Sequence, residues 1–306
     1  MSSLYLTPAI SQPSSWQVAW LAIRPHTLTI SVAPVLVGSS LAWANGSGLL
    51  WLPLLAALCC AVLIQIGTNL HNDAVDCEKG NDQMDRLGPL RVTAAGWVPP
   101  NTVRLYALGC FVMAFVLGIY LANQGGWPIV AIGLGSLLSG WAYSGGPYPI
   151  SYSPLGEVFV LLFFGIFAVG GSVWLQGQTP QLDGLFAGII CGLPAAAVLL
   201  VNNTRDLDAD LRVGRRTLAA VLGRNKVAHF YASLMLLPYL LLIALLTQGH
   251  LGGTFALLSI FSTVANIRYF YATKDPAALN PLLGASARSG LFLALLLTLG
   301  LLMETW

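Results

Sequence analysis

Residues 50–91 read LWLPLLAALCCAVLIQIGTNLHNDAVDCEKGNDQMDRLGPLR, an apolar run that ends abruptly in a charged segment. The part at 50–70 contains no charged residue, whereas residues 71–91 hold eight. A helix needs roughly 20 mostly apolar residues to cross the hydrocarbon core of a bilayer. This stretch therefore predicts a membrane-spanning helix whose charged end reaches the water at one face.

The composition of the whole chain has the same character. Its 306 residues include 14 Lys and Arg and 12 Asp and Glu, and 56% are hydrophobic. Charged residues make up 8%, whereas a soluble domain carries roughly 25%. Disordered chains are polar and charge-rich, nucleic-acid binding needs a basic surface that a net charge of +2 does not supply, and membrane β-barrels show short alternating strands. We therefore expect an all-α membrane protein and no nucleic-acid partner.

Apolar runs long enough to span a bilayer recur along the chain. Nine candidates lie near residues 29–45, 50–70, 103–123, 127–143, 157–175, 185–201, 230–248, 252–272 and 289–303. We expect nine transmembrane helices around a central cavity, forming one multi-pass domain over residues 1–306, with 1–15 as a short flexible tail.

The basic residues predict the orientation of these spans, because Lys and Arg are enriched in cytoplasmic loops. With nine spans, all 14 Lys and Arg fall on the side of the N-terminus. The opposite loops, near 46–49, 124–126, 176–184 and 249–251, contain none. The sequence thus predicts a cell inner membrane protein with its N-terminus and charged loops in the cytoplasm and its C-terminus outside.

Most of the charge is concentrated in two islands, residues 71–91 with eight charged side chains and 205–216 with seven. Each island follows directly from an apolar run, and the two are four spans apart. This spacing predicts two related halves.

The first island continues the helical periodicity of the run before it. Gln65, Asn69, Asp73 and Asp76 step by four, four and three, which places them on one helical face, and Asn72 lies one turn before Asp76. Carboxylate and amide oxygens in this arrangement suit a hard divalent cation. The same ladder recurs in the second island at Asn202, Asp206 and Asp210.

Two such ladders that face each other predict a site for two Mg²⁺ ions with a diphosphate between them, since Mg²⁺ usually binds one or two carboxylates together with substrate phosphate. Basic side chains are interleaved with the acids, and guanidinium groups suit phosphate oxygens. The candidate diphosphate ligands are Lys79, Arg86, Arg91, Arg205, Arg212 and Arg215. The alternative is a pair of solvated loops whose charges serve solubility and orientation.

The sequences of the islands, and of longer segments that contain or neighbour them, are similar to those of a known family. The motifs are Asn72-Asp73-x-x-Asp76, Asp206-x-x-x-Asp210, WLAIRPHTLTISVAPVLVG at 20–38, YSGGPYPISYSPLGEVFVLLFFG at 143–165 and VNNTRDLDADLRVGRRTLAAVLG at 201–223. Over nearly the whole chain they resemble the UbiA-type intramembrane prenyltransferases. The details around Asp85 and Gly145 resemble the branch that prenylates 1,4-dihydroxy-2-naphthoate in menaquinone synthesis. A third aspartate of the family is replaced here by Gly80, and Asp82 takes its place as a further candidate metal ligand.

The resemblance implies a reaction. Asp73, Asp76, Asp206 and Asp210 would act in catalysis by holding Mg²⁺ on the diphosphate of a polyprenyl donor, while the tail lies among lipid-facing helices. Ionisation gives an allylic cation, the naphthoate ring attacks it, and the carboxylate leaves as CO₂. The product is demethylmenaquinol, and no protein partner is expected.

An aromatic wall can stabilise such a cation. Tyr143, Tyr148 and Phe163 are the candidates, with Asn69 beside the same pocket. Ordinary packing or an interfacial aromatic belt is the alternative for the three rings.

Other functions stay open at this point. The same chemistry would suit 4-hydroxybenzoate as acceptor, for ubiquinone, or a phytyl donor, for phylloquinone. A secondary transporter is more remote, because transporters place polar groups near the bilayer midplane and the acids here lie at one face.

Overall fold

The computed structural model describes residues 13–81 and 87–304, and within these ranges the regular structure is helical throughout. The elements are α1 (Ser15–Ile23), α2 (Pro25–Ala44), α3 (Trp51–Glu78), α4 (Pro100–Gly125), α5 (Trp127–Ala142), η1 (Ile150–Tyr152), α6 (Gly156–Leu161), η2 (Leu162–Ile166), α7 (Phe167–Leu175), α8 (Leu182–Arg205), α9 (Leu207–Arg212), α10 (Leu218–Thr247), η3 (Leu251–Ser259), α11 (Ile260–Ala272), η4 (Pro276–Leu279) and α12 (Asn280–Met303). The all-α prediction is confirmed.

The predicted spans reappear in the same order. In the described part of the chain, eight helices or fused helical segments are long and apolar enough to cross a membrane. The predicted span at 127–143 corresponds to α5, an apolar helix of 16 residues, which at 1.5 Å per residue is about 24 Å long. Because the hydrocarbon core is about 30 Å thick, α5 falls slightly short of a full crossing.

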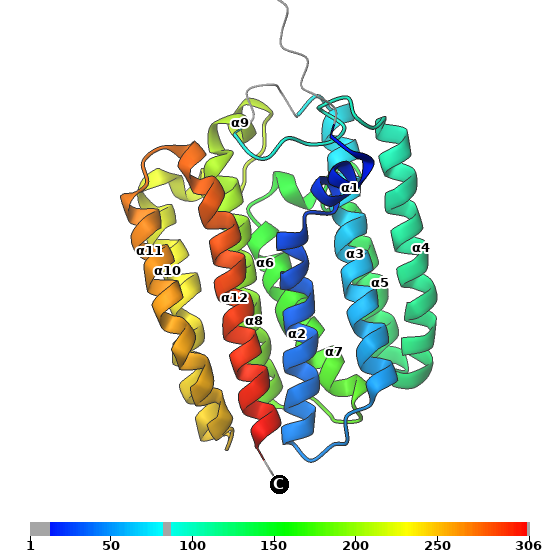
Figure 1. Cartoon of the computed structure of the whole chain (residues 1–306), viewed down its shortest axis with the longest axis vertical. Coiled ribbons are helices and arrows are strands. Elements are labelled where there is room, and N and C mark those ends of the chain that lie inside the picture. Colours follow the sequence, from blue (N-terminus) through cyan, green and yellow to red (C-terminus); the bar gives the residue numbers. More distant parts are fainter. Residues whose placement is uncertain (1–12, 82–86, 305–306) are drawn as a thin grey trace, which may run out of the picture.

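The helices form one bundle in which both acidic islands lie at the same end (Figure 1). Helix α3 has 28 residues, so its last turns, which carry the first island, extend beyond an apolar segment of ordinary length. Helix α9 and the short helix α1 lie at this end, and the C-terminus lies at the other (Figure 1). Helix α8 is central and packs against α2, α6, α7, α10 and α12.

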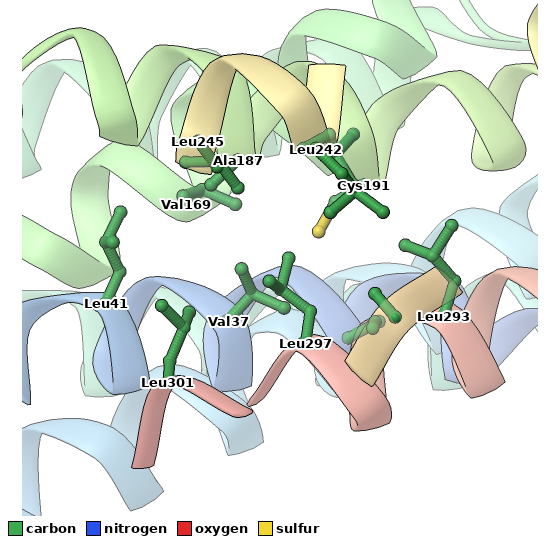
Figure 2. Close-up of a cluster of buried hydrophobic side chains, with 14 of the residues drawn as sticks. Val37, Leu41, Val169, Ala187, Cys191, Leu242, Leu245, Leu293, Leu297 and Leu301 are labelled. Carbon is green, nitrogen blue, oxygen red and sulfur yellow. The ribbon is translucent and has the colours of Figure 1, made fainter. Parts of the chain in front are cut away.

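Small residues allow this close packing. A methyl group at Gly165 would lie 2.4 Å from the backbone oxygen of Gly188, so α8 and η2 approach backbone to backbone, as small residues permit in lipid. Beside this contact, apolar side chains of α2, α7, α8, α10 and α12 interdigitate in a dry cluster (Figure 2). The central helices therefore form a rigid frame for the island of α8.

Helix α1 is a feature that the sequence did not predict, because its nine residues are too few to span a bilayer. Trp16 and Trp20 on this helix are 71% and 50% exposed. Exposed tryptophans are typical of helices that lie in the membrane interface. Residues 1–12 lie outside the described ranges, so the tail itself stays a prediction.

A buried histidine closes the end of the bundle that is opposite the islands. His250 Nδ1 lies 2.9 Å from Glu304 Oε2, and its Nε2 lies 3.3 Å from Asp183 Oδ2. Asn45 donates to Asp183 at 2.7 Å, and the Gly252 amide donates to Glu304 at 2.6 Å. Burial lowers the pKa of His250, but the hydrogen bonds to Asp183 and Glu304 outweigh burial and raise the pKa above 6.5.

The His250 cluster predicts a pH-dependent stability. Because the pKa is higher in the folded state, the stabilisation is complete below pH 6.5 and is lost as the pH rises through the folded pKa. Charge-assisted hydrogen bonds contribute about 1.5–3 kcal/mol. We expect the melting temperature of the purified protein to fall between pH 6 and pH 9, and to fall less in His250→Gln. Parallel pH profiles for the two proteins would contradict this role.

Candidate active site

Residues 71–78 of the first island lie on the final turns of α3, as predicted. Asn69, Asp73 and Asp76 are buried, with 6%, 1% and 1% exposure. Asn69 donates to the backbone oxygen of Ile23 at 3.0 Å and to Thr27 at 2.9 Å. The amide thereby ties α3 to the junction of α1 and α2.

Asp76 is the most heavily paired carboxylate of this island. Arg91 donates to its Oδ2 at 2.7 Å, Arg215 forms an ion pair with its Oδ1, and Asn81 donates to the same Oδ1 at 3.1 Å. Arg91 also donates to Asn72, at 3.1 Å to the backbone oxygen and 3.4 Å to the side chain. Two guanidinium groups thus compensate a carboxylate that would be costly to bury alone.

The second island is built differently from the predicted ladder. Asp206 both ends α8 and begins α9, so one continuous helix does not run through Asn202, Asp206 and Asp210. The four-residue spacing survives in the backbone, because Asp206 donates to Asn202 at 3.1 Å and Asp210 donates to Asp206 at 2.8 Å.

Arg205 is only 2% exposed, and its guanidinium lies beside the interruption of the helix at Asp206. It donates to both carboxylate oxygens of Asp206, at 2.8 and 2.6 Å, and to Asn202 at 2.8 Å. Its remaining terminal nitrogen donates to Asn280 on α12 at 3.0 Å. The guanidinium therefore holds Asn202 and Asp206 at the end of α8 and ties them to α12.

Arg215 brings the two islands together. It pairs with Asp76 of α3 and, at 3.5 Å, with Asp210 of α9, residues that are far apart in the sequence. Its guanidinium carbon also lies 4.8 Å from the centre of the Tyr152 ring. Burial alone would lower the pKa of Arg215, but the charges of Asp76 and Asp210 outweigh it and raise the pKa. The prediction that the islands face each other is thus matched by the geometry.

Asp73 and Asp210 have fewer positively charged partners than Asp76. Thr93 donates to the Asp73 carboxylate, and no described basic side chain forms an ion pair with it. Burial raises the pKa of Asp210 to about 6, even though the charge of Arg215 acts to lower it. Asp73, which has no ion pair among the described residues, and Asp210, whose one printed ion pair is the longer contact of 3.5 Å with Arg215, fit a divalent cation.

Within residues 13–81 and 87–304, no three acidic, histidine or cysteine side chains converge as a preformed cage. Such a cage is not what Mg²⁺ needs when phosphate oxygens complete its coordination. The oxygen donors present therefore fit a metal that arrives with a diphosphate.

The islands lie at the mouth of a cavity of about 870 Å³. A smaller polar pocket of about 60 Å³ adjoins it between the two islands. Asn72, Arg91, Tyr143 and Asn202 line both spaces, and Asp73 lines the larger one. Polar groups and an apolar cavity thus meet at a single boundary.

Three phenylalanines form part of the cavity wall. Phe163 lies 6.2 Å from Phe159 and 5.2 Å from Phe167 between ring centres, and all three line the cavity. Residues 162–166 form a π-helix, a rare feature that is frequent at functional sites. Tyr143 lines both the cavity and the polar pocket. Phe159 and Phe167 were missed, although their four-residue spacing from Phe163 was visible in the sequence.

The remaining predicted residues take different places, and only some of them lie at the site. Tyr148 is 92% exposed and does not line the cavity, while Tyr152 lies beside Arg215 instead. Lys79 donates to the Ser144 backbone oxygen at 3.1 Å and lies over the Tyr152 ring. Arg212 lines the polar pocket. Asp82 and Arg86 lie outside the described residues.

Other residues at the site had no strong signal in the sequence. Thr93, Asn81 and Tyr152 act through contacts between distant segments. Glu157, 4% exposed at the start of α6, accepts from Asn203 at 2.9 Å, and Arg24 has a left-handed backbone with φ of 53° beside the cavity.

Carboxylate, amide and guanidinium groups thus border an apolar cavity inside a helical bundle. The model of the UbiA prenyltransferase family matches residues 31–296. The chain belongs to this family.

The chain matches known relatives over nearly the whole of both sequences. It is 36% identical to 1,4-dihydroxy-2-naphthoate octaprenyltransferase of Escherichia coli (strain K12), over 94% of this chain and 96% of that protein. It is 31% identical to 1,4-dihydroxy-2-naphthoate octaprenyltransferase of Bacillus subtilis (strain 168), over 97% and 96% of the two chains.

Solved structures share the fold. The apo structure of a UbiA homolog from Aeropyrum pernix K1 matches with a TM-score of 0.67 at 15% identity, covering 92% of this chain and 98% of that one. A UbiA homolog from Archaeoglobus fulgidus bound to DMAPP and Mg²⁺ matches with a TM-score of 0.58 at 13% identity, over 91% and 98%.

Because Asp76 has two arginine partners and Asp73 has none among the described residues, replacing each by alanine should change the stability by different amounts. Asp76→Ala leaves Arg91 and Arg215 buried without this carboxylate, and breaking a buried pair costs about 3–5 kcal/mol. Asp73→Ala removes one hydrogen-bonded carboxylate, which contributes about 1.5–3 kcal/mol. We expect a larger fall in melting temperature for Asp76→Ala, measured in detergent without ligand. Equal melting temperatures would contradict the ion-pair assignment.

Proposed function

We propose that this enzyme transfers the polyprenyl group of a polyprenyl diphosphate to 1,4-dihydroxy-2-naphthoate with loss of CO₂, giving demethylmenaquinol for menaquinone synthesis. The observation that carries the proposal is the bridge formed by Arg215 between the two islands at the mouth of the apolar cavity. The names of the Escherichia coli and Bacillus subtilis relatives support naphthoate as the acceptor and octaprenyl as the donor group.

The islands supply the diphosphate site in this proposal. Asp73 and Asp76 with Asn72 on one side, and Asp206 and Asp210 with Asn202 on the other, would hold two Mg²⁺ ions. When bound, Mg²⁺ neutralises charge that develops on a leaving diphosphate. The Archaeoglobus fulgidus homolog that binds DMAPP and Mg²⁺ supports this use of the metal.

The arginines have a second task once a diphosphate is present. Arg91, Arg205 and Arg215 donate to carboxylates in the structure, and the same planar donors suit phosphate oxygens. A cation held by the carboxylates would leave these donors available for the diphosphate. The ion pairs between the arginines and the aspartates keep both sets of charges compensated.

The cavity supports the reacting carbon atoms. When the C–O bond to the diphosphate breaks, the tail becomes an allylic cation, and an apolar wall keeps water from quenching it. The faces of Phe163 and its neighbours stabilise positive charge through the ring quadrupole. The ring carbon of the naphthoate then forms the new C–C bond, and the electron pair of the departing carboxylate restores the aromatic ring.

This proposal predicts a defined stoichiometry. Purified protein with octaprenyl diphosphate, carboxyl-labelled 1,4-dihydroxy-2-naphthoate and Mg²⁺ is expected to release one CO₂ for each diphosphate. Chelation should stop both releases and added Mg²⁺ should restore them. Asp73→Ala and Asp206→Ala should abolish both while leaving membrane insertion intact.

The same assay is repeated with 4-hydroxybenzoate as the acceptor and with phytyl diphosphate as the donor. Diphosphate release with 4-hydroxybenzoate but not with the naphthoate would assign another acceptor. Failure with every acceptor, together with solute flux in vesicles, would assign a transporter.

We also propose that the islands face the cytoplasm, because every Lys and Arg falls on that side of the predicted spans. A reporter that is active only outside the cytoplasmic membrane, fused after residue 304, should be active, whereas the same reporter inserted at Gly214 should be silent. The reverse pattern would invert the topology.

A further inference from the structure

We infer that the deep end of the cavity, kept open by Gly118 and Gly133, holds the far isoprene units of the donor tail and thereby sets the tail length that the enzyme prefers. This inference rests on the proposed function and specifies its donor. It assigns a specificity role to two glycines that lie far from both islands.

The depth of the cavity follows from the face that α3 presents to it. The lining residues of α3 step by three and one from Asp73 down to Ala57, along Asn72, Asn69, Thr68, Gln65, Ile64, Ala61 and Cys60. Sixteen residues at 1.5 Å each correspond to about 24 Å. The cavity therefore runs from the first island through most of the membrane thickness.

This depth can be compared with the donor. An extended polyprenyl chain gains roughly 4–5 Å per isoprene unit, scaled from the roughly 3.5 Å of an extended three-bond peptide residue. About 24 Å then accommodates about five units. The remaining units of an octaprenyl tail must fold back or leave the cavity between helices.

The floor of the cavity is an apolar cluster at the end of the bundle opposite the islands. Leu121, Ile129 and Leu175 pack there against Ala57 and Cys60, and all five also line the cavity. An inserted tail would meet this cluster last.

Gly118 on α4 and Gly133 on α5 lie just above that floor. They are on opposite sides of the short connection at Gly126, so the two antiparallel helices bring them to the same depth. Both line the cavity, and a methyl group added at either one would meet no atom within 4 Å. Open space therefore lies beside both cavity-lining glycines, and neither of them serves a close helix contact.

Other glycines of the cavity wall differ in this respect. A methyl group at Gly140 would lie 2.6 Å from the Thr68 hydroxyl, and one at Gly171 would lie 3.2 Å from Ile132. Those two glycines make room for neighbouring side chains. Gly118 and Gly133 instead make room for a ligand.

The test compares Gly118→Leu and Gly133→Leu with the wild type, using donors of two, three, five and eight isoprene units and the same naphthoate acceptor. Leucine favours the helix over glycine, so both variants should fold. We expect kcat/KM for the two-unit donor to stay within about twofold. For the five- and eight-unit donors we expect a fall of roughly 10–200-fold, the range that one badly fitting methylene group costs in an apolar pocket.

Gly109→Leu is the matched control. Gly109 lies on α4, is exposed, does not line the cavity, and has no atom within 4 Å of an added methyl group. This variant should keep the wild-type response to every donor.

Equal activity of all four proteins with every donor, or equal losses with short and long donors, would overturn the inference. If the wild type transfers no tail at all, the proposed function fails. In that case, the rise in melting temperature caused by non-reactive prenyl thiolodiphosphates of two and five units measures binding in the cavity without turnover. The inference fails if the five-unit compound stabilises the leucine variants as much as the wild type.

Discussion

The ion pairs of Arg215 with Asp76 and Asp210 are the interaction on which the rest of the site depends. The chain has few charges, and this guanidinium joins two carboxylates from helices that are far apart in the sequence. A buried charge without a partner is strongly destabilising, and this pairing compensates the carboxylates of α3 and α9 where the two helices approach each other. The arrangement also keeps the carboxylates and guanidinium groups needed for a metal–diphosphate substrate in one place before the substrate binds.

The boundary between polar and apolar surroundings gives this pairing its chemical meaning. A diphosphate needs charged ligands, whereas an allylic cation and a long tail need a dry environment. Asn72, Arg91, Tyr143 and Asn202 stand where the polar pocket meets the cavity. The proposed bond cleavage would take place at this boundary, with the phenylalanine wall on the apolar side and the islands on the other.

The sequence predicted the helical class, the order of the spans and the position of both islands, because apolar length and charge clustering are local signals. It predicted the face of α3 that carries Asn69, Asp73 and Asp76, since that helix continues without a break. It did not predict the interruption at Asp206, the interfacial helix α1, or the roles of Thr93 and Tyr152. The roles of Thr93 and Tyr152 depend on contacts between segments distant in the sequence. Tyr148, predicted for the aromatic wall, is exposed and does not line the cavity.

The central claim is that the paired islands form one site for a diphosphate with Mg²⁺. The most direct measurement is the melting temperature of the purified protein with a non-reactive prenyl thiolodiphosphate and Mg²⁺, since a ligand that binds only the folded state raises it. We predict a rise that needs both components together and disappears in Asp73→Ala and in Asp206→Ala. A rise that is unchanged without Mg²⁺, or unchanged in both variants, would contradict the account.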